Sequence, residues 1–129
     1  RLLPLFLESA KIMEGSKFVI AGASKKITKL ISGYTQSIPI FYGSTYDIME
    51  ASDLILTSSG TATLETACFS TPMVVVYRLN WLTYFIVKQM ISIPNISMAN
   101  IVAGRHIVPE LVQGQAVPSA ISMEALRSE

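Results

Sequence analysis

The chain has 129 residues, half of them hydrophobic and 15% charged, which is enough for the core of one domain and excludes a disordered tail. Its formal net charge is only +1 and no dense basic cluster appears, so a nucleic-acid partner is not expected. One cysteine excludes an internal disulfide, and one histidine without a cluster of acidic residues or cysteines gives no basis for a metal site.

The first half of the chain predicts helices and strands in alternation. Apolar residues at helical spacing predict a helix over residues 2–14, which Gly15 ends. The elements expected next are a strand at 18–21, a helix at 25–31 capped by Ser24, a strand at 38–42 and a short helix at 45–51.

The second half continues the alternation. Its expected elements are a strand at 53–57, a turn at 58–60, a helix at 61–69, a strand at 73–77, a helix from 80 to about 90, an irregular segment at 92–100, a strand or turn near 101–102, a helix at 106–112 and a closing helix from 118. Alternating strands and helices with short loops predict right-handed crossovers and a parallel sheet. The expected fold class is therefore α/β, a Rossmann-like parallel sheet flanked by helices, in one domain spanning residues 1–129.

The turn at residues 58–61 is the first candidate site, because it joins the end of a strand to the start of a helix. Ligands bind at that edge of a parallel sheet, and the free N–H groups of the first helical turn favour an anion such as phosphate. Gly60 allows close approach to the backbone, and Ser59 and Thr61 add hydroxyl donors. The alternative is an ordinary capped turn, since serine and threonine are preferred N-caps. Neither a GxxxxGK[ST] nor a GxGxxG motif is present.

Glu65 strengthens the ligand-binding interpretation of this turn. It follows Thr61 by four residues and therefore lies one helical turn further along, about 5.4 Å away on the same side. A carboxylate there could accept hydrogen bonds from ribose hydroxyls beside a diphosphate. The alternative is that an acidic residue near a helix N-terminus only stabilises the helix dipole.

Three further features allow two interpretations each. Arg105 follows a flexible glycine and suits either a diphosphate or a solvated surface. Cys68 lies in an apolar pattern, which favours a buried small side chain over a nucleophile. The segment 81–91 is apolar nearly all round, with Trp81, Tyr84 and Lys88 on one face; we favour packing in the core or against a subunit over contact with lipid.

The segments SSGTATLETACFSTPMVVVYR, LNWLTYFIVK and SMANIVAGRHIVPELVQ closely resemble the C-terminal nucleotide-binding half of lipid-A-disaccharide synthase, a bacterial inverting glycosyltransferase of the GT-B fold. The resemblance covers nearly the whole chain and is strongest from Asp53 to Gln113. It implies transfer of 2,3-diacylglucosamine from UDP-2,3-diacylglucosamine to lipid X (2,3-diacylglucosamine 1-phosphate). The products are lipid A disaccharide 1-phosphate and UDP, with neither a metal nor another cofactor required.

The same resemblance implies roles for individual residues. It places the diphosphate at Ser59, Gly60 and Thr61 and the ribose at Glu65. By analogy with the related undecaprenyl-linked peptidoglycan glycosyltransferase, the backbone near Tyr42 would meet the uracil.

Asn100 and Arg105 match the NIVAGR-type segment of the family and are expected to face the diphosphate or the acceptor phosphate. The chain departs from the family at Met98-Ala99-Asn100, where Leu-Pro-Asn is common.

The resemblance also implies that these residues are a piece of a longer two-domain enzyme. The family carries a Gly-Ser-Arg motif upstream of the first helix, and an N-terminal domain that holds the general base. This chain alone is therefore expected to bind UDP but not to catalyse transfer. The full enzyme is expected in the bacterial cytoplasm, peripheral on the inner membrane, and a homodimer is left open. The alternatives are another GT-B UDP-sugar transferase or epimerase, and a non-catalytic dimerisation module.

Overall fold

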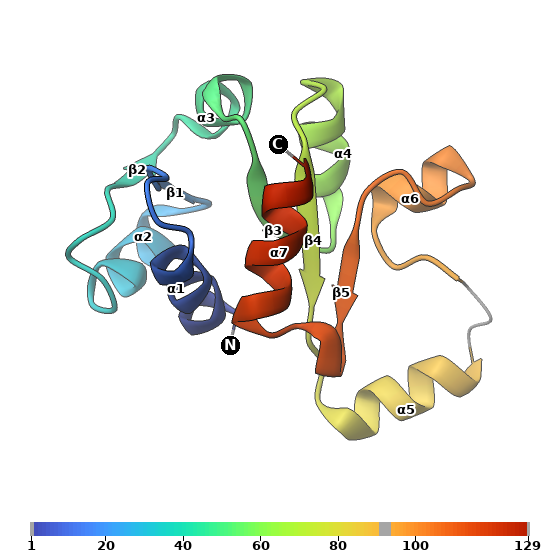
Figure 1. Cartoon of the computed structure of the whole chain (residues 1–129). Helices are drawn as coiled ribbons and strands as arrows, with labels where there is room; N and C mark the ends of the chain where they lie inside the picture. Colours follow the sequence, from blue (N-terminus) through green and yellow to red (C-terminus); the bar gives the residue numbers. More distant parts are fainter. Residues whose placement is uncertain (1, 91–93, 129) are drawn as a thin grey trace.

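The computed structural model describes residues 2–90 and 94–128, and its helices and strands alternate along the chain (Figure 1). The elements are α1 Leu3–Ile12, β1 Ile20–Gly22, α2 Lys25–Ser32, β2 Ile40–Tyr42, α3 Thr45–Ala51, β3 Ile55–Ser58, α4 Thr61–Cys68, β4 Met73–Tyr77, α5 Trp81–Met90, α6 Met98–Ala103, β5 Glu110–Val112, the 3₁₀ turn η1 Gln113–Gln115, and α7 Pro118–Ser128. This order confirms the predicted α/β class.

Every strand pair is parallel, as predicted, but the strands form two separate sheets. In the smaller sheet β1 pairs with β2, and Ile20 lies opposite Ile40. In the larger sheet the order is β3-β4-β5, with Leu56 opposite Val74. The strands that were expected to form a single parallel sheet are therefore divided between two sheets.

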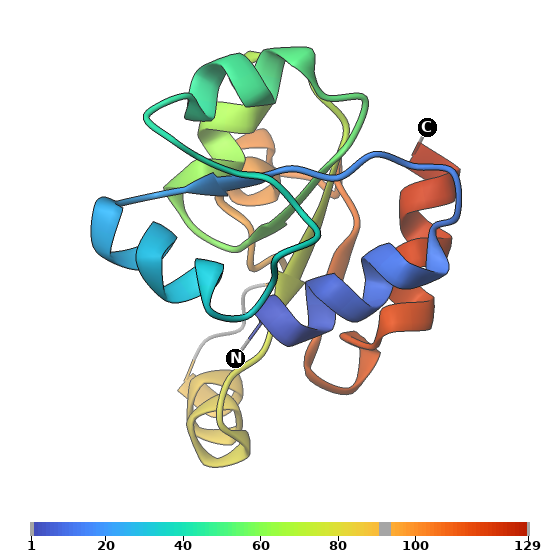
Figure 2. The ribbon, with the colours of Figure 1, turned by 90° about the vertical axis from the view of Figure 1, so that its left-hand side faces the viewer.

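The core forms around β4, whose residues Met73–Val76 are buried. On one face, α1 and α7 pack together and α7 covers β4, which brings Leu5 and Ile121 against Val74 and Val76. Figure 2 shows α1 and α7 side by side, on the opposite side of the larger sheet from α4 and α6. A strand buried on both faces reads as a continuous apolar run, which explains why the sequence predicts β4 well.

Two expectations for residues 101–112 were wrong. Ile101 and Val102 belong to helix α6, not to a strand or turn. Ser97 caps this helix by accepting a hydrogen bond from the Asn100 N–H at 3.2 Å, and Gly104 ends it in the left-handed region at φ +65°. The segment expected to be a helix from 106 to 112 is a loop followed by β5. Of the segment 92–100 that was expected to be irregular, residues 98–100 belong to α6, which corrects that expectation, and residues 92 and 93 lie outside the described residues.

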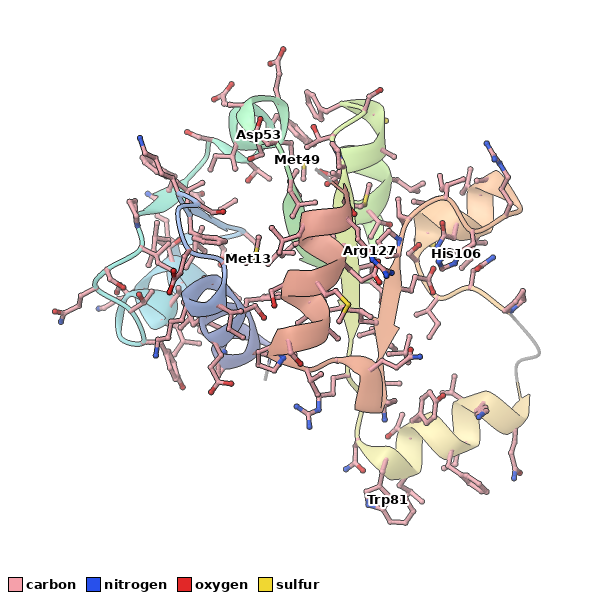
Figure 3. All side chains as sticks on the ribbon, in the orientation of Figure 1. Met13, Met49, Asp53, Trp81, His106 and Arg127 are labelled. Carbon is pink, nitrogen blue, oxygen red and sulfur yellow. The ribbon has the colours of Figure 1, made fainter. Side chains whose placement is uncertain are left out.

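Helix α5 shows that packing of residues 81–91 in the core was also a wrong expectation. Trp81 is 74% exposed, and Leu82, Phe85 and Ile86 are also exposed. Figure 1 shows α5 projecting away from the sheet beyond the end of β4, and in Figure 3 Trp81 lies on the outer side of that helix. Subunit packing and lipid contact remain as alternatives. Residue 91 lies outside the described residues, and none of the described helices is both long and apolar enough to cross a bilayer.

Cys68 is exposed, so its expected burial was wrong as well. The face of α4 that turns inward carries Thr63 and Thr66 instead. Cys68 stands at the last position of the helix, off that face.

Candidate functional site

The turn between β3 and α4 requires a glycine for conformational reasons. Gly60 adopts φ +140° and ψ −167°, a backbone region that other residues rarely occupy. An added Cβ would meet no atom within 4 Å, so crowding does not demand the glycine. The turn therefore depends on the backbone freedom of Gly60 and lies beside open space.

Hydrogen bonds to the Gly60 carbonyl set the direction of the next N–H group. This carbonyl accepts from the Thr63 backbone N–H at 3.1 Å and from the Thr63 hydroxyl at 2.8 Å, both inside α4. In a trans peptide the C=O and N–H bonds point in opposite directions. The Thr61 N–H in the same peptide plane therefore points away from the helix, and Thr61 itself is exposed.

The alternative of an ordinary serine or threonine N-cap does not match this helix. Gly60 is the N-cap residue, and it provides no side-chain hydrogen bond to the N–H groups of the first turn. Apart from the Thr63 N–H, which donates to the Gly60 carbonyl, these donors at the positive end of the helix dipole are available for an anion.

Glu65 lies one turn further along α4, half-buried and beside Tyr46 at the start of α3. The negative charge of its carboxylate raises the pKa of the Tyr46 phenol, since it opposes formation of a phenolate. The Tyr46 ring also packs against Phe69, with ring centroids 5.8 Å apart. The sequence does not predict a role for Tyr46, whose only signal is its place just after the Gly43-Ser44 turn that follows β2.

Tyr42 ends β2 in the smaller sheet, and its side chain is half-exposed. The ammonium group of Lys25 lies 6.0 Å from the centroid of its ring, a separation that allows a cation–π contact. Because no strand pairing joins β2 to β3 in the described residues, Tyr42 and Ser59 do not share one sheet edge.

Asn100 is fully buried and faces the loop before β5. Its Oδ1 accepts hydrogen bonds from the N–H groups of Ile107 at 2.7 Å and Val108 at 2.9 Å. Its Nδ2 donates to the Val108 carbonyl at 2.9 Å and to Glu110 Oε1 at 2.6 Å. These bonds occupy the whole amide group, so the structure does not bring Asn100 to the turn at Gly60 as a phosphate contact. Asn100 instead stabilises the conformation of this loop through its hydrogen bonds to the loop backbone.

Glu110, at the start of β5, was not predicted from the sequence. Its carboxylate accepts hydrogen bonds from the backbone N–H groups of Ile96 at 2.8 Å and Ser97 at 3.0 Å, and from Asn100. Burial raises the pKa of this carboxyl, but the hydrogen bonds together hold the pKa below its usual value. At neutral pH a negative charge therefore sits at the N-terminus of α6, where the helix dipole favours it.

Arg105 lies at the other end of α6 from the turn. The N-terminal end of α6 meets α4, where the Ala99 N–H donates to the Thr63 hydroxyl at 3.3 Å. Arg105 follows Gly104 beyond the last residue of this helix and is exposed, roughly 9 Å further along at 1.5 Å per residue. His106 is exposed next to it, beside α6 in Figure 3. Within residues 2–90 and 94–128, no three acidic, histidine or cysteine side chains gather to hold a metal ion.

Comparisons with known proteins agree on one family. The family model for lipid-A-disaccharide synthetase matches residues 6–128. The lipid-A-disaccharide synthases of Syntrophus aciditrophicus and Nitrosococcus oceani are 36% and 35% identical to this chain, each across 98% of it and 35% of the relative. That of Cupriavidus pinatubonensis is 40% identical across 84% of this chain and 28% of the relative. The chain spans about a third of the length of the curated relatives that it matches.

Proposed function

The chain belongs to the lipid-A-disaccharide synthetase family, and we propose that residues 1–129 are the UDP-sugar-binding domain of a longer, two-domain glycosyltransferase. The parallel α/β architecture and the length of the relatives support this assignment. The second domain of that enzyme carries the acceptor site and the general base.

The complete enzyme transfers 2,3-diacylglucosamine from UDP-2,3-diacylglucosamine to lipid X. The 6-hydroxyl oxygen of lipid X forms a bond to the anomeric carbon of the donor, while the bond from that carbon to the diphosphate oxygen breaks. A base outside this chain takes the hydroxyl proton, and UDP leaves with the bonding electron pair. The anomeric configuration inverts, and the product is lipid A disaccharide 1-phosphate.

The observation that carries this proposal is the outward N–H group of Thr61 at a helix N-terminus without a side-chain cap. Such donors stabilise the charge that develops on a departing diphosphate. Ser59, Gly60 and Thr61 hold the diphosphate, and Glu65 orients the donor through its ribose.

The remaining contacts stand further from the turn. Tyr42 meets the uracil from the smaller sheet. Arg105 supplies a guanidinium to a phosphate from the far end of α6, which requires its long side chain to reach back. Asn100 acts through the loop that it holds and not as a direct phosphate contact.

UDP titration of the full-length enzyme, with Glu65→Ala as the variant, tests this function. We expect UDP to bind without added metal in the micromolar-to-millimolar range. The Glu65→Ala change should weaken binding at least about tenfold, or about 1.4 kcal/mol, because the ribose hydroxyls lose a charged acceptor.

Glu50→Ala is the matched control, since it removes the same charge from the exposed surface of α3. Equal affinity of Glu65→Ala and wild type would contradict the ribose role. If wild type shows no UDP binding and no protection from thermal unfolding at millimolar UDP, the dimerisation-module alternative gains support. Transfer from non-acylated donors at the same rate would favour another UDP-sugar transferase.

Helix α5 is proposed to rest on the cytoplasmic surface of the bacterial inner membrane. Trp81 and Phe85 are exposed, and Lys88 lies close to the ring of Tyr84, 5.8 Å from its centroid. Aromatic residues with a lysine are typical of helices at a membrane interface. A second copy of the protein, forming a homodimer, is the alternative partner for this surface.

Replacing Trp81 and Phe85 together by alanine is expected to reduce binding of the full-length enzyme to anionic lipid vesicles by more than about tenfold. Each large apolar side chain contributes about 1.5–3 kcal/mol when fully buried, and partial insertion of both is enough for this loss. Vesicle co-sedimentation measures the effect. The control replaces the exposed aromatics Tyr34 and Phe41, which lie at the smaller sheet. Unchanged vesicle binding together with loss of a dimer in analytical ultracentrifugation would reject the membrane role and support the homodimer.

A further inference from the structure

Two buried threonines of α4 have different hydrogen bonds. Thr63 and Thr66 are both fully buried. The Thr66 hydroxyl donates to the Ala62 carbonyl at 2.8 Å, which is a bond inside its own helix. The Thr63 hydroxyl donates to the Gly60 carbonyl at 2.8 Å and also accepts from the Ala99 N–H of α6 at 3.3 Å. Thr63 therefore connects α6 to the turn, whereas Thr66 has no such bond in the described residues.

The end of α6 that meets Thr63 is itself held by β5. Glu110 accepts from the Ile96 and Ser97 N–H groups, and the Ser97 hydroxyl accepts from the Asn100 N–H. The side-chain amide of Asn100 in turn donates a hydrogen bond to the Glu110 carboxylate at 2.6 Å. Among the described residues, no buried side-chain nitrogen or oxygen lacks a partner, so this network is complete. Removing one member would leave others without their bonds.

The peptide between Gly60 and Thr61 is held by two donors of one residue, the Thr63 backbone N–H at 3.1 Å and the Thr63 hydroxyl at 2.8 Å, and only the hydroxyl is linked to α6. Gly60 carries no side chain, and an added Cβ would meet no neighbour within 4 Å. Glycine can adopt the opposite peptide orientation at small steric cost. A reversed peptide would turn the Gly60 carbonyl outward, where its oxygen would repel a phosphate. The Gly60 carbonyl must therefore be held inward, and the Thr63 hydroxyl is the side-chain donor that holds it.

We propose that the hydrogen bonds from Glu110 through α6 to Thr63 fix the orientation of the Gly60–Thr61 peptide and so set the affinity of the turn for diphosphate. Thr63 is then a positioning residue, as are Asn100 and Glu110, and none of the three touches the ligand. This inference rests on the proposed UDP-binding function and adds the hydrogen-bond network that shapes the diphosphate site.

Thr63→Val and Thr66→Val form a matched pair that tests the positioning role of the Thr63 hydroxyl. Both variants exchange a buried hydroxyl for a methyl group on the same helix, and Thr63→Val should lose somewhat more unfolding free energy because the buried Ala99 N–H also loses its acceptor. In calorimetry with UDP on the full-length enzyme, we expect Thr63→Val to weaken binding about tenfold and Thr66→Val to stay within about twofold, since a bond that orients a donor to a charged ligand is lost only in the first. The Michaelis constant for the donor should rise in parallel, while that for the acceptor stays unchanged. Thr63→Ser, which keeps the hydroxyl, should restore both.

The link through α6 is tested by combining Thr63→Val with Glu110→Gln. If the groups act as one chain, their effects on UDP affinity should not add. Fully additive effects would overturn the link, and equal UDP affinity of the two threonine-to-valine variants would overturn the role of Thr63. Failure of the wild-type enzyme to bind UDP would instead reject the proposed function, so the two ideas fail separately.

Discussion

Replacement of Asn100 by alanine is expected to lower the free energy of unfolding by about 3 kcal/mol, because each buried polar group left without a partner costs about 1–3 kcal/mol. The Asn100 side chain accepts hydrogen bonds from the N–H groups of Ile107 and Val108 and donates to the Val108 carbonyl and the Glu110 carboxylate. Alanine makes none of these bonds, and water reaches this site poorly, since Asn100 is fully buried. Urea denaturation followed by circular dichroism measures the loss.

Asn95→Ala provides the comparison, since Asn95 is only half-buried in the loop before α6. That change should cost less than about 0.5 kcal/mol, as is usual for substitutions away from a buried network. A loss below about 1 kcal/mol for Asn100→Ala would mean that other contacts hold residues 104–109 in place.

Replacement of Gly60 by valine is expected to reduce donor turnover by the full-length enzyme roughly a hundredfold, which is the effect of losing one anion-stabilising donor. Valine has a Cβ and cannot hold φ +140° without strain, so the turn must rearrange and the Thr61 N–H must change direction. The same strain should cost about 1–3 kcal/mol of stability, which leaves the protein folded. Steady-state kinetics and thermal unfolding measure the two effects.

Gly114→Val is a suitable control for this variant. Gly114 also has open space around the position of a Cβ, but its φ is not among the positive values of the chain. A side chain there should change neither turnover nor stability much. If Gly60→Val keeps normal turnover, the backbone geometry of the turn is not what stabilises the departing diphosphate.

Local sequence patterns predicted the strand, turn and helix from Ile55 to Cys68 to within two residues. The glycine, the two serines before it and the change from a β-prone run to a helical one all lie within that segment. The same kind of pattern failed at Ile101 and Val102, which are β-branched and suggest a strand. Their helix is stabilised by Glu110, which caps the segment from β5, and such a tertiary contact overrides local preference.

Local sequence patterns also could not predict which residues surround the turn or how they are used. Tyr46 meets Glu65 only because α3 packs beside α4. The buried amide of Asn100 resembles a ligand contact in sequence, since a polar residue beside a glycine and an arginine suits both roles. The exposure of α5 could not be predicted because apolar composition is the same for a core helix and for a helix that binds a surface.

Because the strands form two separate sheets, the local stability differs between two parts of the chain. In the smaller unit, α2 has no buried residue, and only Gly22 is buried in its two strands. The larger unit contains the fully buried strand β4. Cooperative unfolding therefore belongs mainly to β3–β5 and the helices on them, and residues 20–42 form a segment of low local stability. Tyr42 lies at the end of that segment. Its position can therefore change at a smaller cost in free energy than the position of a residue in the larger sheet.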